Sequence, residues 1–152
     1  MIVQTFVAFL GRALLSIIFI SSAVHKIMNW QPALQFFNQE LADWVGISVG
    51  NSFFQPLIEW AFTNSSALLV AGVIFELVGG LLVFFGLWLR LGAVLLILFL
   101  IPTTLVFHHF WVFQGDDREI QMIHFMKNVS ICGGLFYVLA MGKGQKGSRD
   151  LK

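Results

Sequence analysis

Four long apolar stretches dominate this chain, and they occupy residues 5–28, 66–89, 91–113 and 120–141. An apolar helix of about 20 residues crosses the hydrocarbon core of a bilayer. The pattern therefore predicts four membrane-spanning helices. Pro102 predicts a kink in the third, where Thr103 and Thr104 are placed to bond carbonyls that the proline leaves free.

The longest polar interruption, residues 29–65, has a helical period of its own. Pro32 suits a first helical turn, and an apolar face then lies opposite a polar one. The apolar face is Leu34, Phe37, Leu41 and Trp44, and the polar face is Gln35, Gln39, Glu40 and Asp43. We expect this amphipathic helix to lie in the membrane interface. A second short apolar segment follows at 53–62, so the loop is expected to cap the bundle.

Composition agrees with a membrane protein. The 152 residues are 58% hydrophobic and 11% charged, with 17 Phe and 5 Trp, too little polar surface for a soluble fold. We predict an all-α integral membrane four-helix bundle over residues 1–142, followed by a flexible basic cytoplasmic tail over 143–152. A net charge of +1 without a basic stripe indicates no nucleic-acid partner.

Charge placement predicts the orientation. Arg90 lies between spans two and three, and Lys143, Lys146, Arg149 and Lys152 follow span four. The other two loops carry most of the carboxylates, including the acidic turn expected at 114–119. By the positive-inside rule both termini are cytoplasmic.

Ionisable residues inside apolar sequence mark the candidate site, because unpartnered charges in a membrane cost several kcal/mol. In the predicted topology the polar groups of four helix ends gather in the outer third of the membrane. This set is His25, His108, His109, His124, Lys127 and Asn128, with Lys26 at the membrane boundary beside His25. Glu76 lies roughly 15 Å deeper at 1.5 Å per residue. We therefore expect one polar site at the outer end of the bundle.

The spacing of these residues predicts how they face. Glu76 shares a helix face with Gly72 and Gly80, so it points into the bundle, where Arg12 or Lys127 is the expected partner. His108 and His109 leave their helix about 100° apart, so one faces the bundle and the other lies beside Trp111. His124, Lys127 and Asn128 share one face.

Cys132 is the single cysteine, so the chain can form no internal disulfide and no thiol relay. Imidazole suits copper, zinc or iron, but the linear spacing of the histidines is not diagnostic of a metal or haem site. Lys26 and Lys127 would also repel a cation. We therefore assign no metal ligand.

These pieces, in their order along the chain, resemble the DoxX family of small four-helix bacterial membrane proteins. The matching pieces are Gly11-Arg12, Ser21 to Lys26, Glu76 with Gly79-Gly80, Gly86 to Leu91, His108 to Trp111, and His124 to Asn128. The resemblance covers most of the chain, although His25 stands where a smaller or apolar residue is expected. It implies the bacterial inner membrane and a link to respiratory redox chemistry, through quinone or through a membrane partner.

Three functions fit these observations. The first is a quinone- or quinol-linked oxidoreductase subunit, with Glu76, His124 and Lys127 moving protons. Quinone would be held by residues drawn from His25, Lys26, His108, His109, Trp111 and Asn128, with Arg12 nearby. No haem, flavin or iron–sulfur motif is visible, so electrons would come from a membrane or periplasmic redox partner protein. The second function is a non-enzymatic assembly subunit or a carrier of a small hydrophobic ligand, and the third is a metal or haem site. The Gly-rich faces at Gly79-Gly80 and Gly133-Gly134 suit packing within one copy as readily as a homo-oligomer.

Overall fold

The computed structural model describes residues 2–51 and 53–142, and every regular element in them is a helix. The elements are α1 (Ile2–Met28), α2 (Trp30–Ser48), α3 (Phe54–Thr63), α4 (Ser65–Phe85), α5 (Leu89–Phe107), the short 3-10 helix η1 (Phe110–Val112) and α6 (Gly115–Met141). Four of these described segments are long and apolar enough to cross a membrane: α1, α4, α5 continued through η1, and α6. The predicted all-α membrane fold is confirmed.

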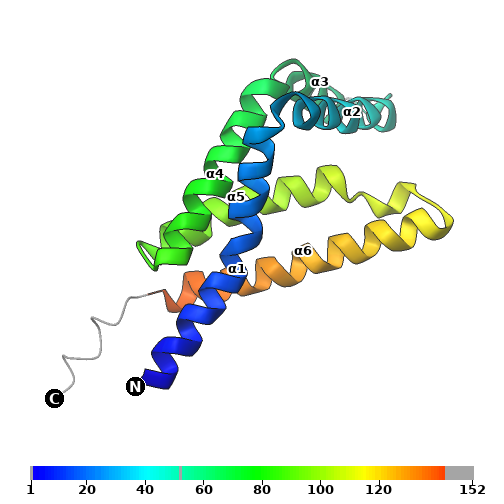
Figure 1. Cartoon of the computed structure of the whole chain (residues 1–152). Coiled ribbons are helices and arrows are strands. Elements are labelled where there is room, and N and C mark those ends of the chain that lie inside the picture. Colours follow the sequence, from blue (N-terminus) through cyan, green and yellow to red (C-terminus); the bar gives the residue numbers. More distant parts are fainter. Residues whose placement is uncertain (1, 52, 143–152) are drawn as a thin grey trace.

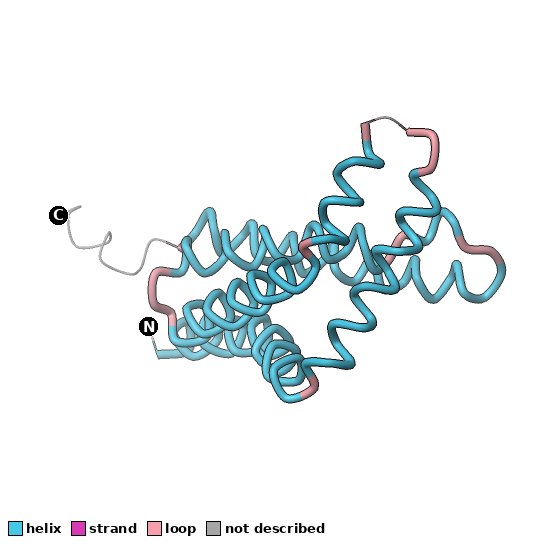
Figure 2. Tube along the Cα trace, turned by 90° about the horizontal axis from the view of Figure 1, so that it is seen from above, coloured by secondary structure: helices cyan, strands magenta, loops and turns pink. Residues whose placement is uncertain are grey.

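The four spans pack in a row, with α1 against α4, α4 against α5, and α5 against α6. The start of α1 and the end of α6 lie at the same end of the molecule, and α2 and α3 lie at the opposite end (Figures 1 and 2). Each span gives a residue to one apolar cluster, namely Phe19, Val83, Leu96 and Leu135. This cluster holds the spans together below the end where α2 crosses.

Glycines allow a close helix contact between α4 and α5. A Cβ added at Gly79 would lie 2.9 Å from Leu96 Cγ and 3.1 Å from the carbonyl oxygen of Gly92. A Cβ at Gly92 would lie 2.9 Å from the Cβ of Leu82. The two backbones touch here because neither position has a side chain. This contact sets the position of α5 against α4. It therefore also positions Thr103 and Phe107, the α5 residues that line the candidate site.

The loop between the first two spans folds largely as predicted. α2 turns Leu34, Phe37, Leu41 and Trp44 toward the protein, and Leu41 is fully buried. The second apolar segment forms α3, in which no residue is fully buried. α2 therefore forms the inner layer of the cap, and α3 packs mainly on α2.

Two helices end earlier than the sequence predicts. The second span was expected to reach residue 89, but α4 ends at Phe85 because Gly86 adopts a left-handed conformation, with φ of 71°. The third span was expected to continue to 113, and the apolar segment does run from Leu89 to Val112, but it is not one unbroken helix. Instead α5 ends at Phe107, and His108 leaves the helix with φ of −128° and ψ of 46°.

The prediction of an acidic turn at 114–119 is wrong, because α6 already begins at Gly115. Asp116 and Asp117 stand in its first turn, where carboxylates stabilise the positive end of the helix dipole. The acidic sequence that suggested a loop is thus a helix start. The predicted basic tail at 143–152 lies outside the described residues.

Candidate functional site

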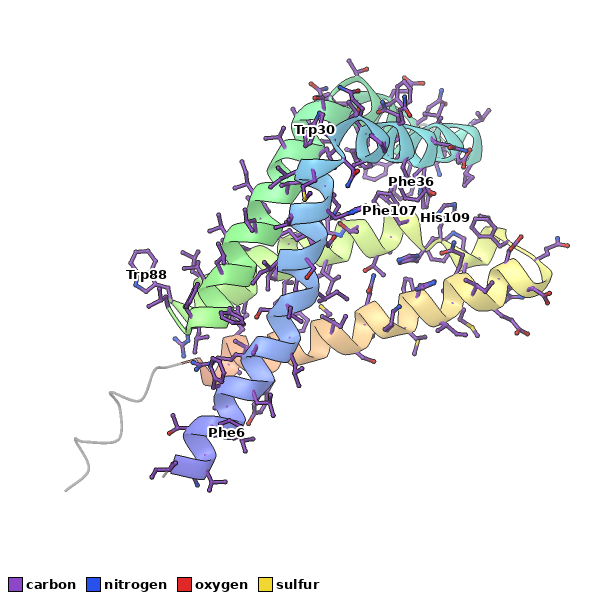
Figure 3. All side chains as sticks on the ribbon, viewed as in Figure 1. Phe6, Trp30, Phe36, Trp88, Phe107 and His109 are labelled. Carbon is purple, nitrogen blue, oxygen red and sulfur yellow. The ribbon has the colours of Figure 1, made fainter. Side chains whose placement is uncertain are left out.

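A cavity of about 620 Å³ opens between α1, α2, α5 and the first half of α6. Its polar lining consists of Ser22, His25, Lys26, Asn29, Glu40, Thr103, His108, Gln121 and His124. Its aromatic lining consists of Phe36, Phe37 and Phe107, and Phe36 lies over Phe107 with ring centroids 5.4 Å apart (Figure 3). The cavity thus combines a flat aromatic wall with hydrogen-bonding groups from several helices.

An ion pair joins the first two spans beside this cavity. The Lys26 ammonium of α1 donates to the Glu76 carboxylate of α4 at 2.7 Å and to the Ser22 hydroxyl at 2.7 Å. The ammonium also lies 5.2 Å from the ring centroid of Phe99. The Glu76 side chain is only 2% exposed, whereas that of Lys26 is 24% exposed. Lys26 therefore stands between the cavity and the buried carboxylate.

Two stacked imidazoles form the opposite side of the cavity. The rings of His108 and His124 are 5.2 Å apart and nearly parallel, at 19°. The His108 Nδ1–H donates to the amide oxygen of Gln121 at 2.8 Å, because that oxygen can only accept. The Lys127 ammonium, which can only donate, reaches the Nδ1 of His124 at 3.0 Å.

These two bonds fix complementary tautomers. His108 carries its proton on Nδ1, so its Nε2 is an acceptor. His124 accepts at Nδ1, so its Nε2 carries the proton and is a donor. One imidazole can therefore donate to a ligand oxygen while its neighbour accepts from a ligand hydroxyl.

His25 and Glu40 line the cavity from α1 and α2. The side-chain amide of Asn29 donates to the Nδ1 of His25, with the two nitrogens 3.3 Å apart. Burial, and then the nearby carboxylate of Asp43, raise the pKa of Glu40 above its ordinary value. The surroundings of Glu40 thus favour its protonated form more than water does.

His109 lies outside the cavity. Its side chain is 2% exposed, and its Nδ1–H donates to the carbonyl oxygen of Val106 at 2.8 Å. The indole N–H of Trp44 donates to the same carbonyl at 3.1 Å, and the Trp44 ring lies 5.1 Å from that of His109. Trp111 packs beside both. The expectation that one histidine of the doublet faces inward and the other lies beside Trp111 agrees with this arrangement.

Two further candidates lie away from the cavity. Asn128 follows His124 by one turn but lines a different hollow, between α5 and α6. Arg12 is fourteen positions before Lys26 on α1, and its guanidinium lies against Gly86 at the end of α4. The partner of Glu76 is therefore Lys26, and neither Arg12 nor Lys127, which the sequence had suggested.

Sequence reasoning missed several lining residues. Gln121 stands three positions before His124, so helical spacing could have added it to the site. Glu40 was assigned to the solvated face of an amphipathic helix, and no sequence signal contradicted this. The aromatic wall is Phe36, Phe37 and Phe107, whereas the ring pocket was expected near Trp111. Among the described residues, no group of three or more His, Cys, Asp and Glu is arranged to hold a metal ion.

This fold and this cavity define a small multi-pass α-helical membrane protein with a polar site at one end of its bundle. The chain belongs to the DoxX family, whose sequence model matches residues 7–109. That match includes Arg12, Lys26, Glu76 and His108 and ends before His124.

One relative is the protein named inner membrane protein YphA of Escherichia coli (strain K12). It is 35% identical to this chain over 75 residues, which are 49% of this chain and 54% of the relative. The matched stretch thus spans about half the length of that relative. No solved structure matches this chain.

Proposed function

We propose that this protein is a quinone- or quinol-linked oxidoreductase subunit of the bacterial inner membrane, acting with a partner protein that supplies or removes electrons. The observation that carries the proposal is the pair of stacked imidazoles with opposite hydrogen-bonding roles in an aromatic cavity. The name of the relative, an inner membrane protein, supports the location.

The cavity suits a quinone ring in size and chemistry. Small-molecule sites are typically about 300–1,000 Å³, largely apolar, with a few placed polar groups. The His124 Nε2–H can donate to a quinone carbonyl, and the His108 Nε2 can accept from a quinol hydroxyl. Phe36 and Phe107 offer flat faces for the ring. The same groups therefore bind both redox states.

Proton handling follows from the groups around the ring. Reduction of quinone takes two electrons and two protons, Q + 2e⁻ + 2H⁺ → QH₂, and oxidation is the reverse. The protonated Nε2 of His124 supplies one proton, and Lys127 restores the imidazole through Nδ1. The Lys26 ammonium supplies the second proton, while the Glu76 carboxylate behind it holds the lysine in place. Glu40, which lines the same cavity on its α2 side, takes up protons from the outside and returns one to Lys26. Both electrons come from the partner protein.

A binding titration tests this proposal. The purified chain in lipid nanodiscs is titrated with a short-tailed ubiquinone analogue, and bound native quinone is measured by mass spectrometry. His124→Phe keeps the stacked ring but removes both nitrogens, so we expect affinity to fall about tenfold, the loss of roughly one hydrogen bond of 1–1.5 kcal/mol. Ser130→Ala, on the exposed side of α6, is the matched control and should bind as wild type.

The alternative is a non-enzymatic assembly subunit or a carrier of a small hydrophobic ligand, favoured by the absence of an electron-carrier motif in the sequence. Equal quinone binding by wild type and His124→Phe, or no quinone bound to either, would overturn the quinone assignment. Binding without electron exchange in membranes that contain a quinol oxidase would favour the carrier.

A further inference from the structure

A second hollow, of about 320 Å³, runs between α5 and α6 and shares no lining residue with the cavity. We call it the α5–α6 groove. Its walls are apolar, with Leu105 and Phe125 among the lining residues nearer the η1 end of these helices and Phe136 nearer the other end. The groove also contains one amide, that of Asn128.

The helix that forms one wall of this groove is the least buried of the four spans. Only 6% of its most apolar 18-residue window is buried, against 17–33% in the other three described spans. The structure describes every residue of α6, and among them only Leu135 is fully buried. Within a single copy, α6 therefore packs on α5 and η1 and leaves most of its surface to the membrane.

Asn128 is the polar group that this arrangement leaves unmatched. Its side chain is half-buried on the groove wall and makes no hydrogen bond to any other described residue. An amide has two donors and an acceptor, and lipid tails can satisfy none of them. An occupant of the groove that can form hydrogen bonds is therefore favoured over an acyl chain.

The groove is also open at a glycine. A Cβ added at Gly133 meets nothing within 4 Å, so the backbone of α6 is bare toward the groove at this point. Small residues on a membrane helix allow another helix to approach closely. Asn128 and Gly133 are about 8 Å apart along the axis of α6 and about 140° apart around it. Because both residues line the groove, a helix seated in the groove would contact both.

We propose that a second copy of this chain docks on the α5–α6 groove, with the two α6 helices crossing beside Asn128 and Gly133. Copies inserted in one orientation are related by a two-fold axis along the membrane normal, so α6 meets α6 as a parallel pair. An asparagine near such an axis is complementary to itself, because each amide donates to the other. The docking thus satisfies the amide that a single copy leaves unpaired.

Subunit counting in vesicles tests this docking. Full-length, singly labelled protein is reconstituted into phosphatidylethanolamine–phosphatidylglycerol vesicles, and photobleaching steps are counted as the lipid-to-protein ratio rises. Wild type should show two steps over a range of ratios. Asn128→Leu should weaken the dimer about three- to twentyfold, the range expected of one interhelical polar pair.

Glycine variants supply the matched control. Gly133→Leu should abolish the two-step population, since the new side chain fits open space within one copy but occupies the crossing point. Gly11→Leu on α1 makes the same change at another position where a Cβ meets nothing within 4 Å, and it should leave the dimer intact. Circular dichroism and gel filtration establish that each variant folds.

Oxidative crosslinking gives a second reading. Cys132 is the only cysteine and lines the same groove, so copper-phenanthroline should crosslink wild type in membranes but neither Cys132→Ser nor Gly133→Leu. One photobleaching step at every lipid ratio for wild type would overturn the proposal. Unchanged dimers in Asn128→Leu and Gly133→Leu, both folded, would overturn the assigned surface.

Discussion

Lys26 of α1 and Glu76 of α4 are joined by a 2.7 Å ion pair, although fifty positions separate them in the chain. The carboxylate is buried and the ammonium reaches the cavity. The pair therefore ties two spans together and connects the interior of the bundle to the candidate site.

Replacing one partner of this ion pair should destabilise the protein more than replacing both partners. Glu76→Leu leaves the Lys26 ammonium without its carboxylate, and Lys26→Met leaves a buried carboxylate without its ammonium, so each should cost about 3–5 kcal/mol. The double variant Lys26→Met with Glu76→Leu should recover most of that loss. Unfolding in mixed detergent micelles measures all four states of the cycle. Additive losses in the double variant would show that the two residues do not interact.

The α4–α5 contact should not tolerate a methyl group. At Gly79, alanine places its Cβ against Leu96 and the Gly92 carbonyl, so we expect a loss of about 1–3 kcal/mol from overpacking. Gly11→Ala on α1 is the matched control, because its Cβ meets nothing within 4 Å, and it should be neutral or stabilising by up to about 1 kcal/mol. The same unfolding measurement applies. Equal stability of the two variants would contradict the close approach.

The anchor of α2 should be measurable through Trp44. Trp44→Phe keeps an aromatic ring but removes the N–H that donates to the Val106 carbonyl, so it should cost about 1 kcal/mol. Hydrogen exchange should become faster in α2 and stay unchanged in α4. Trp60→Phe on the exposed surface of α3 is the control, and it should alter neither.

Glu40 should make stability depend on pH. Its pKa is raised in the folded state, so the folded protein binds this proton more tightly than the unfolded chain does. The cost of the charged form is full above the raised pKa and disappears as pH falls below the ordinary carboxyl value. Glu40→Gln should therefore be more stable than wild type at neutral pH, and the difference should shrink in acid. Unfolding measured from acidic to neutral pH, with Glu59→Gln as an exposed control, tests it; a pH-independent difference would contradict the assignment.

The sequence predicted the spans well because the hydrophobic pattern of a membrane helix is long and local. It predicted that Glu76 faces inward for the same reason, since Gly72 and Gly80 lie on the same helix face. It did not predict Lys26 as the partner, because the choice among Arg12, Lys26 and Lys127 depends on how far each span slides along its neighbour. No periodicity within one helix reports that offset.

In the candidate site, too, the sequence predicted the features set within one helix and missed those set by how helices end and pack. The spacing of His124 and Lys127 along one helix, and the divergence of His108 and His109, follow from helical geometry. The stack of His108 on His124 requires α5 to end at Phe107, which the sequence did not indicate. Phe36 and Glu40 line the cavity only because of the position that α2 takes against the bundle. The sequence pattern of the spans does not determine that position.

The contact of Arg12 with Gly86 restricts how this chain can change. Gly86 has a positive φ, and a Cβ there would meet the guanidinium of Arg12. A side chain at position 86 is therefore unfavourable for two reasons. It strains the left-handed backbone at that position, and it clashes with Arg12 on α1. Exchange of this region between homologous proteins should succeed when α1 and the α4–α5 link are transferred as one block, and a swap of either alone places mismatched partners at the same end of the bundle.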